Sequence, residues 1–311
     1  MFNLCTVLYM KRHRFIYTKI LLLLWVCLVP ACVRQTAQTE ANKVQILKTD
    51  TGMRFGLTGK KSSQPAPTLV ILSGTIEDAL TGVFEDDSSG VKLRICDNNT
   101  LAQNGFIYVS LDLPCHGLER RDNEMQGLDG WRYRIEHGEN FIPEFNARLN
   151  KMLDYLIKEG YSDPEKIALL GISRGGFLAM HFISNESRVK CTVAIAPVVD
   201  LGTLREFKGL EQNSMVTSIA LSNYAGKLSG KAILITIGDQ DARVDTDKVI
   251  AFARSVSQAS GKESHIELRV MPEPRGHYSS WEEVEQSAVW LTKELFPKTK
   301  VLTNNIGKEK L

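Results

Sequence analysis

The sequence lacks the spacings that mark a structural metal site. Its six cysteines form no CxxC pair and its six histidines form no cluster, so a zinc-binding module is not expected. Cys191 lies in an apolar run typical of a core thiol. An oxidising compartment would permit a bridge between Cys96 and Cys115.

The chain also lacks a strong net charge, internal repeats and low-complexity tracts. Lys and Arg total 38 against 36 Asp and Glu, which gives a net charge of +2. Residues 1–31 hold four basic residues and no acidic one, so without them the net charge is −2. We therefore expect no nucleic-acid partner. With 43% hydrophobic and 24% charged residues, the composition is globular and excludes long disorder, collagen and a polytopic membrane protein.

The N-terminus has the features of an export signal. Residues 10–19 are basic, residues 20–29 are an unbroken apolar run, and Pro30-Ala31-Cys32 follows. This order is typical of a secretory signal, and the run is shorter than a membrane span needs. The first nine residues add nothing to the signal, so translation starts at Met1 or at Met10.

Val29-Pro30-Ala31-Cys32 resembles a bacterial lipobox. Cleavage before Cys32 would leave that cysteine as the lipid anchor, which predicts an exported envelope protein, on the outer membrane or the periplasmic face. A plain signal-peptidase cut, which gives a soluble periplasmic or secreted protein, is the alternative. The predicted organisation is a signal at 1–31, a tether at 32–42, a folded domain at 43–297 and a tail at 298–311.

Short apolar runs recur along the chain and predict buried parallel strands. They span residues 68–74, 106–113, 166–173, 189–197, 231–238 and 265–272. Segments 42–48 and 53–58 are candidates for antiparallel edge strands.

Helical patterns lie between these runs. In residues 141–156, apolar side chains recur at steps of three and four and make one stripe. Residues 174–184, 247–259 and 281–295 also predict helices. This alternation predicts an α/β fold with a mostly parallel sheet and helices on both faces. Functional sites of such sheets gather at the carboxyl ends of the strands.

A candidate nucleophile follows one of these strands. Gly171-Ile172-Ser173-Arg174-Gly175 fits GxSxG between an apolar strand and an apolar helix. The serine would sit on a tight strand–helix turn, where the glycines let the two elements approach. The helix N-terminus would favour developing negative charge.

A serine hydroxyl needs a base to take its proton. His277 lies in a loop after the last strand and before the final helix, which suits a base. Asp241 follows the strand at 231–238 and suits the acid that orients the imidazole. Asp200, after the preceding strand, is its rival, and Asp239 is expected to form a turn. The other histidines are His13, His116, His137, His181 and His265.

The order Ser173, Asp241, His277 resembles the α/β-hydrolase superfamily. The resemblance covers roughly residues 65–297, and VSLDLPCHGLE and GDQDARV look closest to the dienelactone-hydrolase and prolyl-oligopeptidase-like group. Pro114-Cys115-His116-Gly117 stands where that group usually has Pro-Gly-His-Gly. The resemblance implies an α/β-hydrolase fold with a small cap insertion and no metal or organic cofactor.

The same resemblance implies an oxyanion hole of two backbone N–H groups. One would come from Arg174, which follows the nucleophile, and the other from Thr75, with Ile76 as the alternative. Such donors stabilise charge that appears only in the tetrahedral intermediate.

Two insertions are expected to set specificity, residues 114–140 and residues 198–229. Trp131 and Arg134 either line a cleft or pack the first insertion onto the body, and the second role is favoured. Arg174 would meet a substrate anion or a structural carboxylate.

The expected function is hydrolysis of small or carbohydrate-linked carboxylic esters through an acyl-enzyme. A peptidase of prolyl-oligopeptidase type is the first alternative. A catalytically silent binding lipoprotein is the second.

Overall fold

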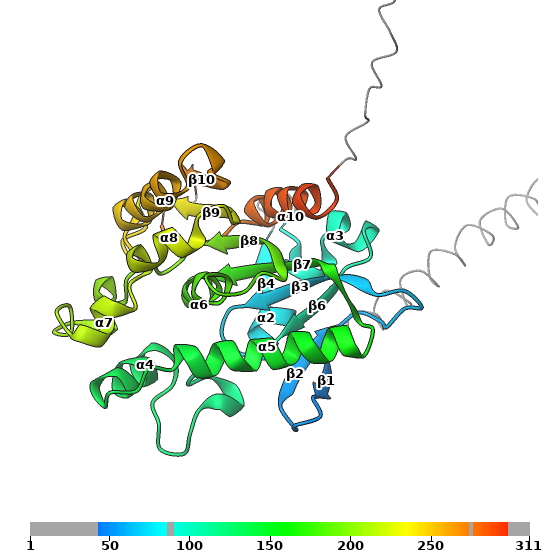
Figure 1. The fold of residues 1–311 in the computed structure, drawn as a ribbon, viewed down its shortest axis with the longest axis horizontal. Helices are drawn as coiled ribbons and strands as arrows, with labels where there is room; N and C mark the ends of the chain where they lie inside the picture. The colour runs from blue at the N-terminus through cyan, green and yellow to red at the C-terminus, as the bar shows by residue number, and fades with distance from the viewer. Residues whose placement is uncertain (1–42, 86–89, 274–275, 298–311) are drawn as a thin grey trace, which may run out of the picture. The chain divides into compact units, whose positions relative to one another are not determined.

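A twisted, mostly parallel sheet forms the centre of the fold (Figure 1). The computed structural model describes residues 43–85, 90–273 and 276–297. Within them, one eight-stranded sheet has the order β1-β2-β6-β3-β7-β8-β9-β10. Its strands are β1 (Gln45–Lys48), β2 (Arg54–Thr58), β3 (Ala66–Leu72), β6 (Ile107–Ser110), β7 (Ser162–Ile172), β8 (Val189–Ile195), β9 (Ala232–Gly238) and β10 (Ile266–Met271).

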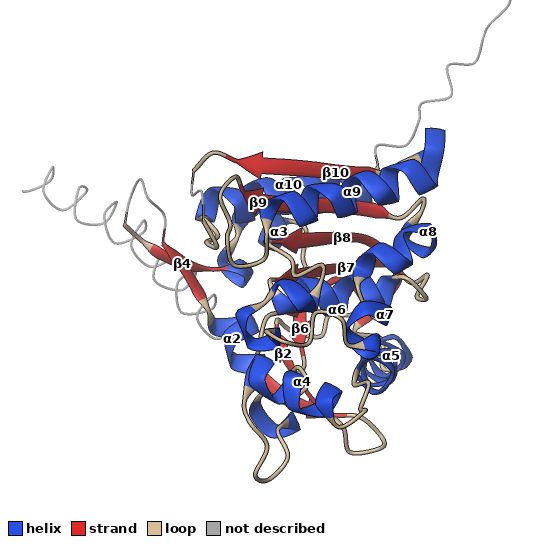
Figure 2. Cartoon of the chain, turned by 90° about the vertical axis from the view of Figure 1, so that its left-hand side faces the viewer, coloured by secondary structure: helices blue, strands red, loops and turns tan. Residues whose placement is uncertain are grey.

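The strand directions confirm the predicted sheet. β3 and β6 to β10 pair in parallel, and β1 and β2 pair antiparallel at one edge. All seven residues of β9 are buried, as expected for a central strand covered on both faces. Figure 2 shows β7 to β10 lying side by side.

Helices cover both faces of the sheet (Figure 1). The core on one face includes side chains of α5 (Ile142–Lys158), α6 (Arg174–Ile183) and α9 (Thr246–Ser260). The core on the other includes side chains of α2 (Ile76–Thr81), α3 (Asn99–Gln103) and α10 (Trp281–Leu295). The four helices predicted from periodicity are therefore confirmed, as α5, α6, α9 and α10.

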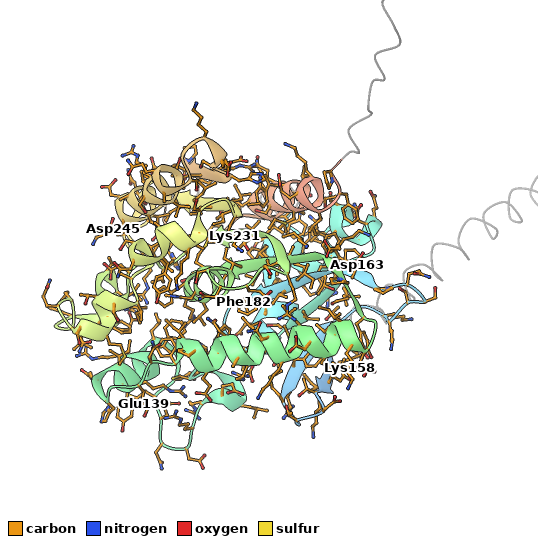
Figure 3. The ribbon with its side chains drawn as sticks, in the orientation of Figure 1. Glu139, Lys158, Asp163, Phe182, Lys231 and Asp245 are labelled. Carbon is orange, nitrogen blue, oxygen red and sulfur yellow. The ribbon has the colours of Figure 1, made fainter. Side chains whose placement is uncertain are left out.

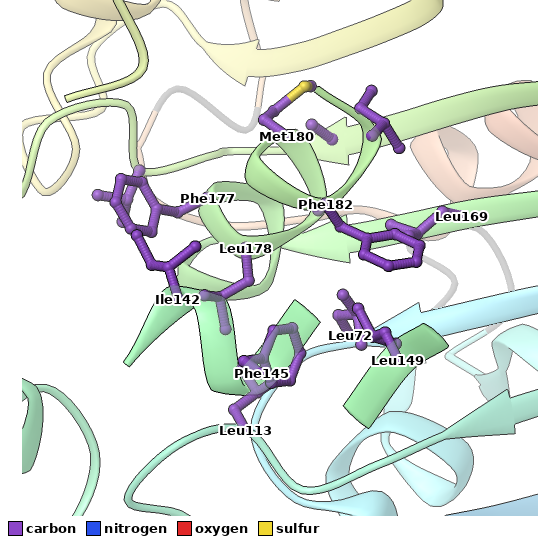
Figure 4. Close-up of a cluster of buried hydrophobic side chains, with 14 of the residues drawn as sticks. Leu72, Leu113, Ile142, Phe145, Leu149, Leu169, Phe177, Leu178, Met180 and Phe182 are labelled. Carbon is purple, nitrogen blue, oxygen red and sulfur yellow. The ribbon is translucent and has the colours of Figure 1, made fainter. Parts of the chain in front are cut away.

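The apolar stripe of α5 faces the first of these cores. Figure 4 shows Phe145 and Leu149 of this helix among Leu113, Leu178 and Phe182. All five side chains are at most 2% exposed. Burying such a side chain contributes about 1.5–3 kcal/mol, so this packing holds α6, and with it the turn before α6, against the sheet.

The two insertions fold as short elements. The first contains η2 (Gly117–Glu119) and α4 (Gly127–Glu136). The second forms the predicted small cap helices. These are η3 (Leu201–Thr203), η4 (Arg205–Phe207), α7 (Ser214–Ser218), η5 (Leu221–Tyr224) and α8 (Ala225–Leu228).

A small hairpin lies between β3 and β6 and was not predicted. β4 (Val83–Glu85) and β5 (Lys92–Arg94) pair antiparallel in a sheet of their own. The remaining short helices are η1 (Ile95–Asp97), before α3, and η6 (Gly261–Glu263), after α9.

Cys96, Cys115 and Cys191 are buried and free, so the bridge considered between Cys96 and Cys115 is not formed. In the described ranges, no helix combines the length and apolar character needed to cross a membrane. The predicted signal at 1–31, the tether at 32–42 with Cys32, and the tail at 298–311 lie outside the described residues.

Candidate active site

Ser173 stands on a sharp turn between β7 and α6. Its φ of 53° lies in a region that side chains rarely adopt, and its ψ is −116°. The turn is held by the Ser173 N–H, which donates to Ile195 O at 2.9 Å, and by the Val198 N–H, which donates to Ser173 O at 3.1 Å. Strain at a single well-anchored residue is typical of a functional turn.

Glycines allow this turn to form. A Cβ on Gly175 would collide with the carbonyl oxygen of Leu72 in β3, and one on Gly171 would lie 2.6 Å from Gly175 O. Neither neighbour is a flexible side chain, so both positions require glycine. The flanking glycines of the motif therefore have the steric role that the sequence predicts.

The structure brings His277 and Asp241 to Ser173. His277 Nε2 lies 3.1 Å from Ser173 Oγ, and His277 Nδ1 lies 2.8 Å from Asp241 Oδ2. A carboxylate only accepts, so Nδ1 carries the hydrogen and Nε2 of the neutral ring is left to accept the serine proton. The three predicted side chains thus form one hydrogen-bonded chain.

The carboxylate of Asp241 is fully buried, whereas the His277 side chain is 30% exposed. The other carboxylate oxygen of Asp241, Oδ1, accepts the backbone N–H groups of Arg243 at 2.9 Å and Val244 at 3.2 Å. Burial alone would raise the pKa of Asp241, but the bonds from His277 and these amides outweigh it and the pKa is lowered. The acid therefore stays ionised beside the imidazole.

The other candidate residues have different partners. Asp200 caps η3 by accepting the Gly202 N–H at 2.9 Å and lies 3.4 Å from Lys248 Nζ. His181 is buried and its Nε2 donates to Ile219 O at 2.9 Å. His265 pairs with Glu294 at 3.2 Å. These residues do not join Ser173.

The first expected oxyanion donor is available. The Arg174 N–H opens α6, so it has no partner inside the helix, and it donates to no other carbonyl in the part of the chain that is described. The Arg174 N–H lies next to the nucleophile, where it can donate to the substrate carbonyl oxygen as that oxygen gains negative charge.

The second expected donor is already occupied. The Thr75 N–H donates to Asp78 Oδ2 at 2.9 Å, and the alternative, Ile76, donates its N–H to Asp112 Oδ1 at 2.8 Å. Thr75 and Asp78 form a capping box at the start of α2. The Thr-x-x-Asp spacing in the sequence is typical of such a capping box. Thr75 can serve only if Asp78 moves away.

A cleft of about 510 Å³ opens beside His277. Its lining combines apolar side chains with the charged Asp78, Glu85 and Lys92. It is lined by Ser73, Asp78, Ala79, Gly82, Val83, Phe84, Glu85, Lys92, Ile95, Ile172, Ala196, His277, Tyr278 and Ser279. The unpredicted β4–β5 hairpin therefore supplies part of this cleft.

Neither Trp131 nor Arg134 lines this cleft: Trp131 packs the first insertion against Phe177 of α6, and Arg134 braces the insertion internally. Trp131 is fully buried and its Nε1 donates to Pro114 O at 2.7 Å. Arg134 donates from Nε and Nη2 to the two carboxylate oxygens of Glu124. These contacts fix the loop that carries His116.

The site lies at the carboxyl edge of the parallel strands. Figure 3 labels Asp245, which follows β9 and the loop of Asp241, at one end of the sheet, and Lys158 and Asp163 at the other. Across the described residues, no group of three His, Cys, Asp or Glu side chains is arranged to hold a metal ion.

Comparison with known proteins agrees with this architecture. Residues 149–295 match the prolyl oligopeptidase family. No curated protein sequence is significantly similar to the chain.

Solved structures share the fold at low identity. Dipeptidyl peptidase 4 of Porphyromonas gingivalis is 17% identical with a TM-score of 0.57, and oligopeptidase B of Leishmania major is 16% identical with a TM-score of 0.55. Each match covers 81% of this chain but only 35% and 36% of the peptidase. The chain therefore spans about a third of the length of these peptidases.

An esterase of Pyrococcus furiosus is 19% identical with a TM-score of 0.53, and that match covers 81% of this chain and 92% of the esterase. The sheet order, the strand–turn–helix around Ser173 and the family match together confirm the resemblance seen in the sequence. The chain has an α/β-hydrolase-like fold, and its residues 149–295 are similar to the prolyl oligopeptidase family.

Proposed function

We propose that the chain is a serine hydrolase that cleaves carboxylic esters through Ser173, His277 and Asp241. The hydrogen-bonded chain from Ser173 Oγ through His277 to the buried Asp241 carboxylate carries this proposal. The three groups have the order and the hydrogen-bond geometry that nucleophilic catalysis by serine requires.

The reaction follows from this geometry. Ser173 Oγ attacks the ester carbonyl carbon while His277 Nε2 takes its proton, and the Arg174 N–H donates to the resulting oxyanion. The intermediate collapses to an acyl-enzyme as His277 gives the proton to the leaving alcohol. Water then attacks the acyl carbon, His277 takes its proton, and Ser173 recovers that proton as the acid leaves.

Two observations favour an ester over a peptide substrate. The chain matches nearly the whole length of the Pyrococcus esterase but only about a third of each peptidase. The cap is built from short helices of three to five residues, so the approach to Ser173 is not covered by a second large domain within the described residues. The match to the prolyl oligopeptidase family keeps a peptidase as the second candidate.

The test combines a covalent probe with an activity panel. A fluorophosphonate should label the wild-type protein, and Ser173→Ala should abolish both labelling and the hydrolysis of p-nitrophenyl esters. Ser187→Ala is the matched control, because Ser187 is exposed and precedes β8 at the opposite edge of the sheet. Aminoacyl p-nitroanilide turnover above ester turnover would establish the peptidase instead.

We also propose export and lipid anchoring at Cys32. The support is the basic and apolar order of residues 10–29 and the lipobox-like Val29-Pro30-Ala31-Cys32. Substrates of an anchored hydrolase would be esters present at the cell envelope.

A further inference from the structure

Arg174 follows the nucleophile and carries a guanidinium group that no carboxylate binds in an ion pair within the described residues. The side chain is half-buried. Asp78 and Glu206 are the carboxylates close enough to influence Arg174. Asp78 Oδ2 accepts the Thr75 N–H at 2.9 Å, and both oxygens of Glu206 are bound at 2.8 Å by Arg243 Nη1 and Nη2. The Arg174 side chain therefore forms no hydrogen bond or ion pair with the described residues, and its donors are available to a ligand.

His116 lies near Arg174 and offers a hydrogen-bond acceptor where Arg174 offers donors. It is 3% exposed, and its Nδ1 lies 2.8 Å from Pro114 O. A carbonyl only accepts, so Nδ1 carries the hydrogen, and Nε2 of the neutral ring has a lone pair. Burial lowers the pKa of His116, which favours this neutral form. The buried Nε2 has no hydrogen-bond partner in the structure.

The two groups face the same space above Gly127, the first residue of α4. A Cβ built on Gly127 would lie 3.3 Å from Arg174 Nη1 and 3.5 Å from His116 Nε2. The backbone here is fixed by the Gly127 N–H, which donates to Cys115 O at 2.9 Å. Because position 127 has no side chain, this space is bounded by one donor and one acceptor.

A hydroxyl group is a small group that can accept a hydrogen bond from one partner and donate one to the other. Its oxygen accepts from the guanidinium, and its hydrogen goes to the imidazole lone pair. A carboxylate would face that lone pair with its own, and an alkyl group would leave both partners unpaired, which costs about 1–3 kcal/mol for a buried group. We propose that Arg174 and His116 form a subsite for a hydroxyl group of the ester substrate, beside Ser173.

This subsite rests on the proposed function and narrows it to hydroxyl-bearing esters, of which acylated sugars are the main class. Consecutive Cα atoms are about 3.8 Å apart, so the Arg174 side chain begins one residue from the nucleophile. A site built to bond a hydroxyl rejects the analogue that lacks it, because its own polar groups are then left unpaired.

The test compares esters matched for acyl group and size. Acetylated methyl glucoside is paired with cyclohexylmethyl acetate, and p-nitrophenyl 3-hydroxybutyrate with p-nitrophenyl butyrate, so that either side of the ester is sampled. The wild type should favour the hydroxylated member of at least one pair by about tenfold or more in kcat/KM. Arg174→Met and His116→Phe should each bring this ratio close to one. The ratio is the readout, since it is independent of how much protein folds.

Gly127→Ala fills the space and should abolish the preference as well. Gly138→Ala is its matched control, because Gly138 follows the other end of α4, has a similar φ of 77° against 67°, and has nothing within 4 Å of an added Cβ. It imposes the same kind of backbone strain without touching the subsite and should keep the preference.

The outcomes separate this inference from the proposed function. If the wild type shows no preference, or prefers a carboxylate-bearing ester such as a hemisuccinate, the subsite is wrong while Ser173-dependent hydrolysis stands. If Arg174→Met and His116→Phe keep the wild-type preference for the hydroxylated ester, the preference arises elsewhere in the protein, and the subsite is again wrong. If no ester is cleaved, or if Ser173→Ala cleaves them at the wild-type rate, the proposed function fails and the subsite fails with it.

Discussion

At the scale of single residues, the carboxylate of Asp241 determines which nitrogen of His277 carries the hydrogen. We expect Asp241→Asn to lower kcat for p-nitrophenyl acetate by a factor on the order of 10⁴, because the amide can hold the ring in the unproductive tautomer. Steady-state kinetics at pH 7.5 measures this. Asp200→Asn, at the rival position, should keep kcat within about threefold of the wild type. A larger loss of kcat in Asp200→Asn than in Asp241→Asn would make Asp200 the acid of the triad.

The glycine after the nucleophile gives a second prediction at this scale. Gly175→Ala should lower the free energy of unfolding by more than about 3 kcal/mol, because the new Cβ collides with backbone of β3 and the strained turn cannot relax. Urea denaturation measures the change. Gly226→Ala is the control, since nothing lies within 4 Å of a Cβ there and helix α8 should gain up to about 1 kcal/mol. Equal stability of the two variants would contradict the steric account.

The residues brought together at the site were predictable, and the occupied oxyanion donor was not. GxSxG, the loop histidine and the post-strand aspartate each have a local signal, and the parallel sheet requires that they meet at one edge. Thr75 can act as an oxyanion donor only if its N–H faces the substrate and does not donate to a capping side chain. Both roles suit the same loop–helix start, so the spacing to Asp78 alone does not decide between them.

At the scale of elements, long periodic segments were predicted closely and short ones were missed. The predicted helix at 281–295 coincides with α10, and the predicted helix at 174–184 ends one residue beyond α6. α4 and the β4–β5 hairpin were missed because their order comes from tertiary contacts. α4 is anchored by buried Trp131 and by the pair of Arg134 with Glu124, which the sequence does not show as a pair.

His181 joins α6 to the cap and should make stability depend on pH. Burial lowers its pKa to about 4, against an ordinary value of 6.5. Between pH 6.5 and pH 4 the unfolded chain binds the proton and the folded chain does not, so stability falls as the pH drops through this window. The shift corresponds to about 3 kcal/mol.

Urea denaturation at pH 7.0, 5.5 and 4.5 tests this linkage. His181→Phe should lose the part of the slope that belongs to this histidine, although it also loses the hydrogen bond to Ile219 and starts from a lower stability at pH 7.0. His137→Gln, at an exposed histidine after α4, should retain the wild-type slope. A wild-type slope in His181→Phe would show that the loss at acid pH has another origin.

At the scale of the whole molecule, the alternation of strands and helices was enough to predict the fold. Parallel strands need crossovers, the crossovers are right-handed, and two covered faces follow, which leaves few topologies for this order of elements. The same pattern does not predict the substrate. The cleft, the cap and the space above Gly127 arise where insertions meet the body, and no periodic pattern encodes those contacts.

The location of the whole protein depends on residues 1–42, which lie outside the described structure. We expect the protein, expressed in a bacterium that processes lipoproteins, to incorporate labelled palmitate and to sediment with membranes, because an acylated cysteine with several chains anchors stably. Cys32→Ala should lose both properties, whereas Cys96→Ala, at a buried cysteine of the fold, should keep them. A chain that starts at Met10 should be processed like one that starts at Met1, because residues 1–9 add nothing to the signal. Palmitate labelling that survives in Cys32→Ala would contradict the assignment of Cys32 as the lipid anchor, and a wild type without palmitate would leave a plain signal-peptide cut and a soluble envelope enzyme as the description of the mature protein.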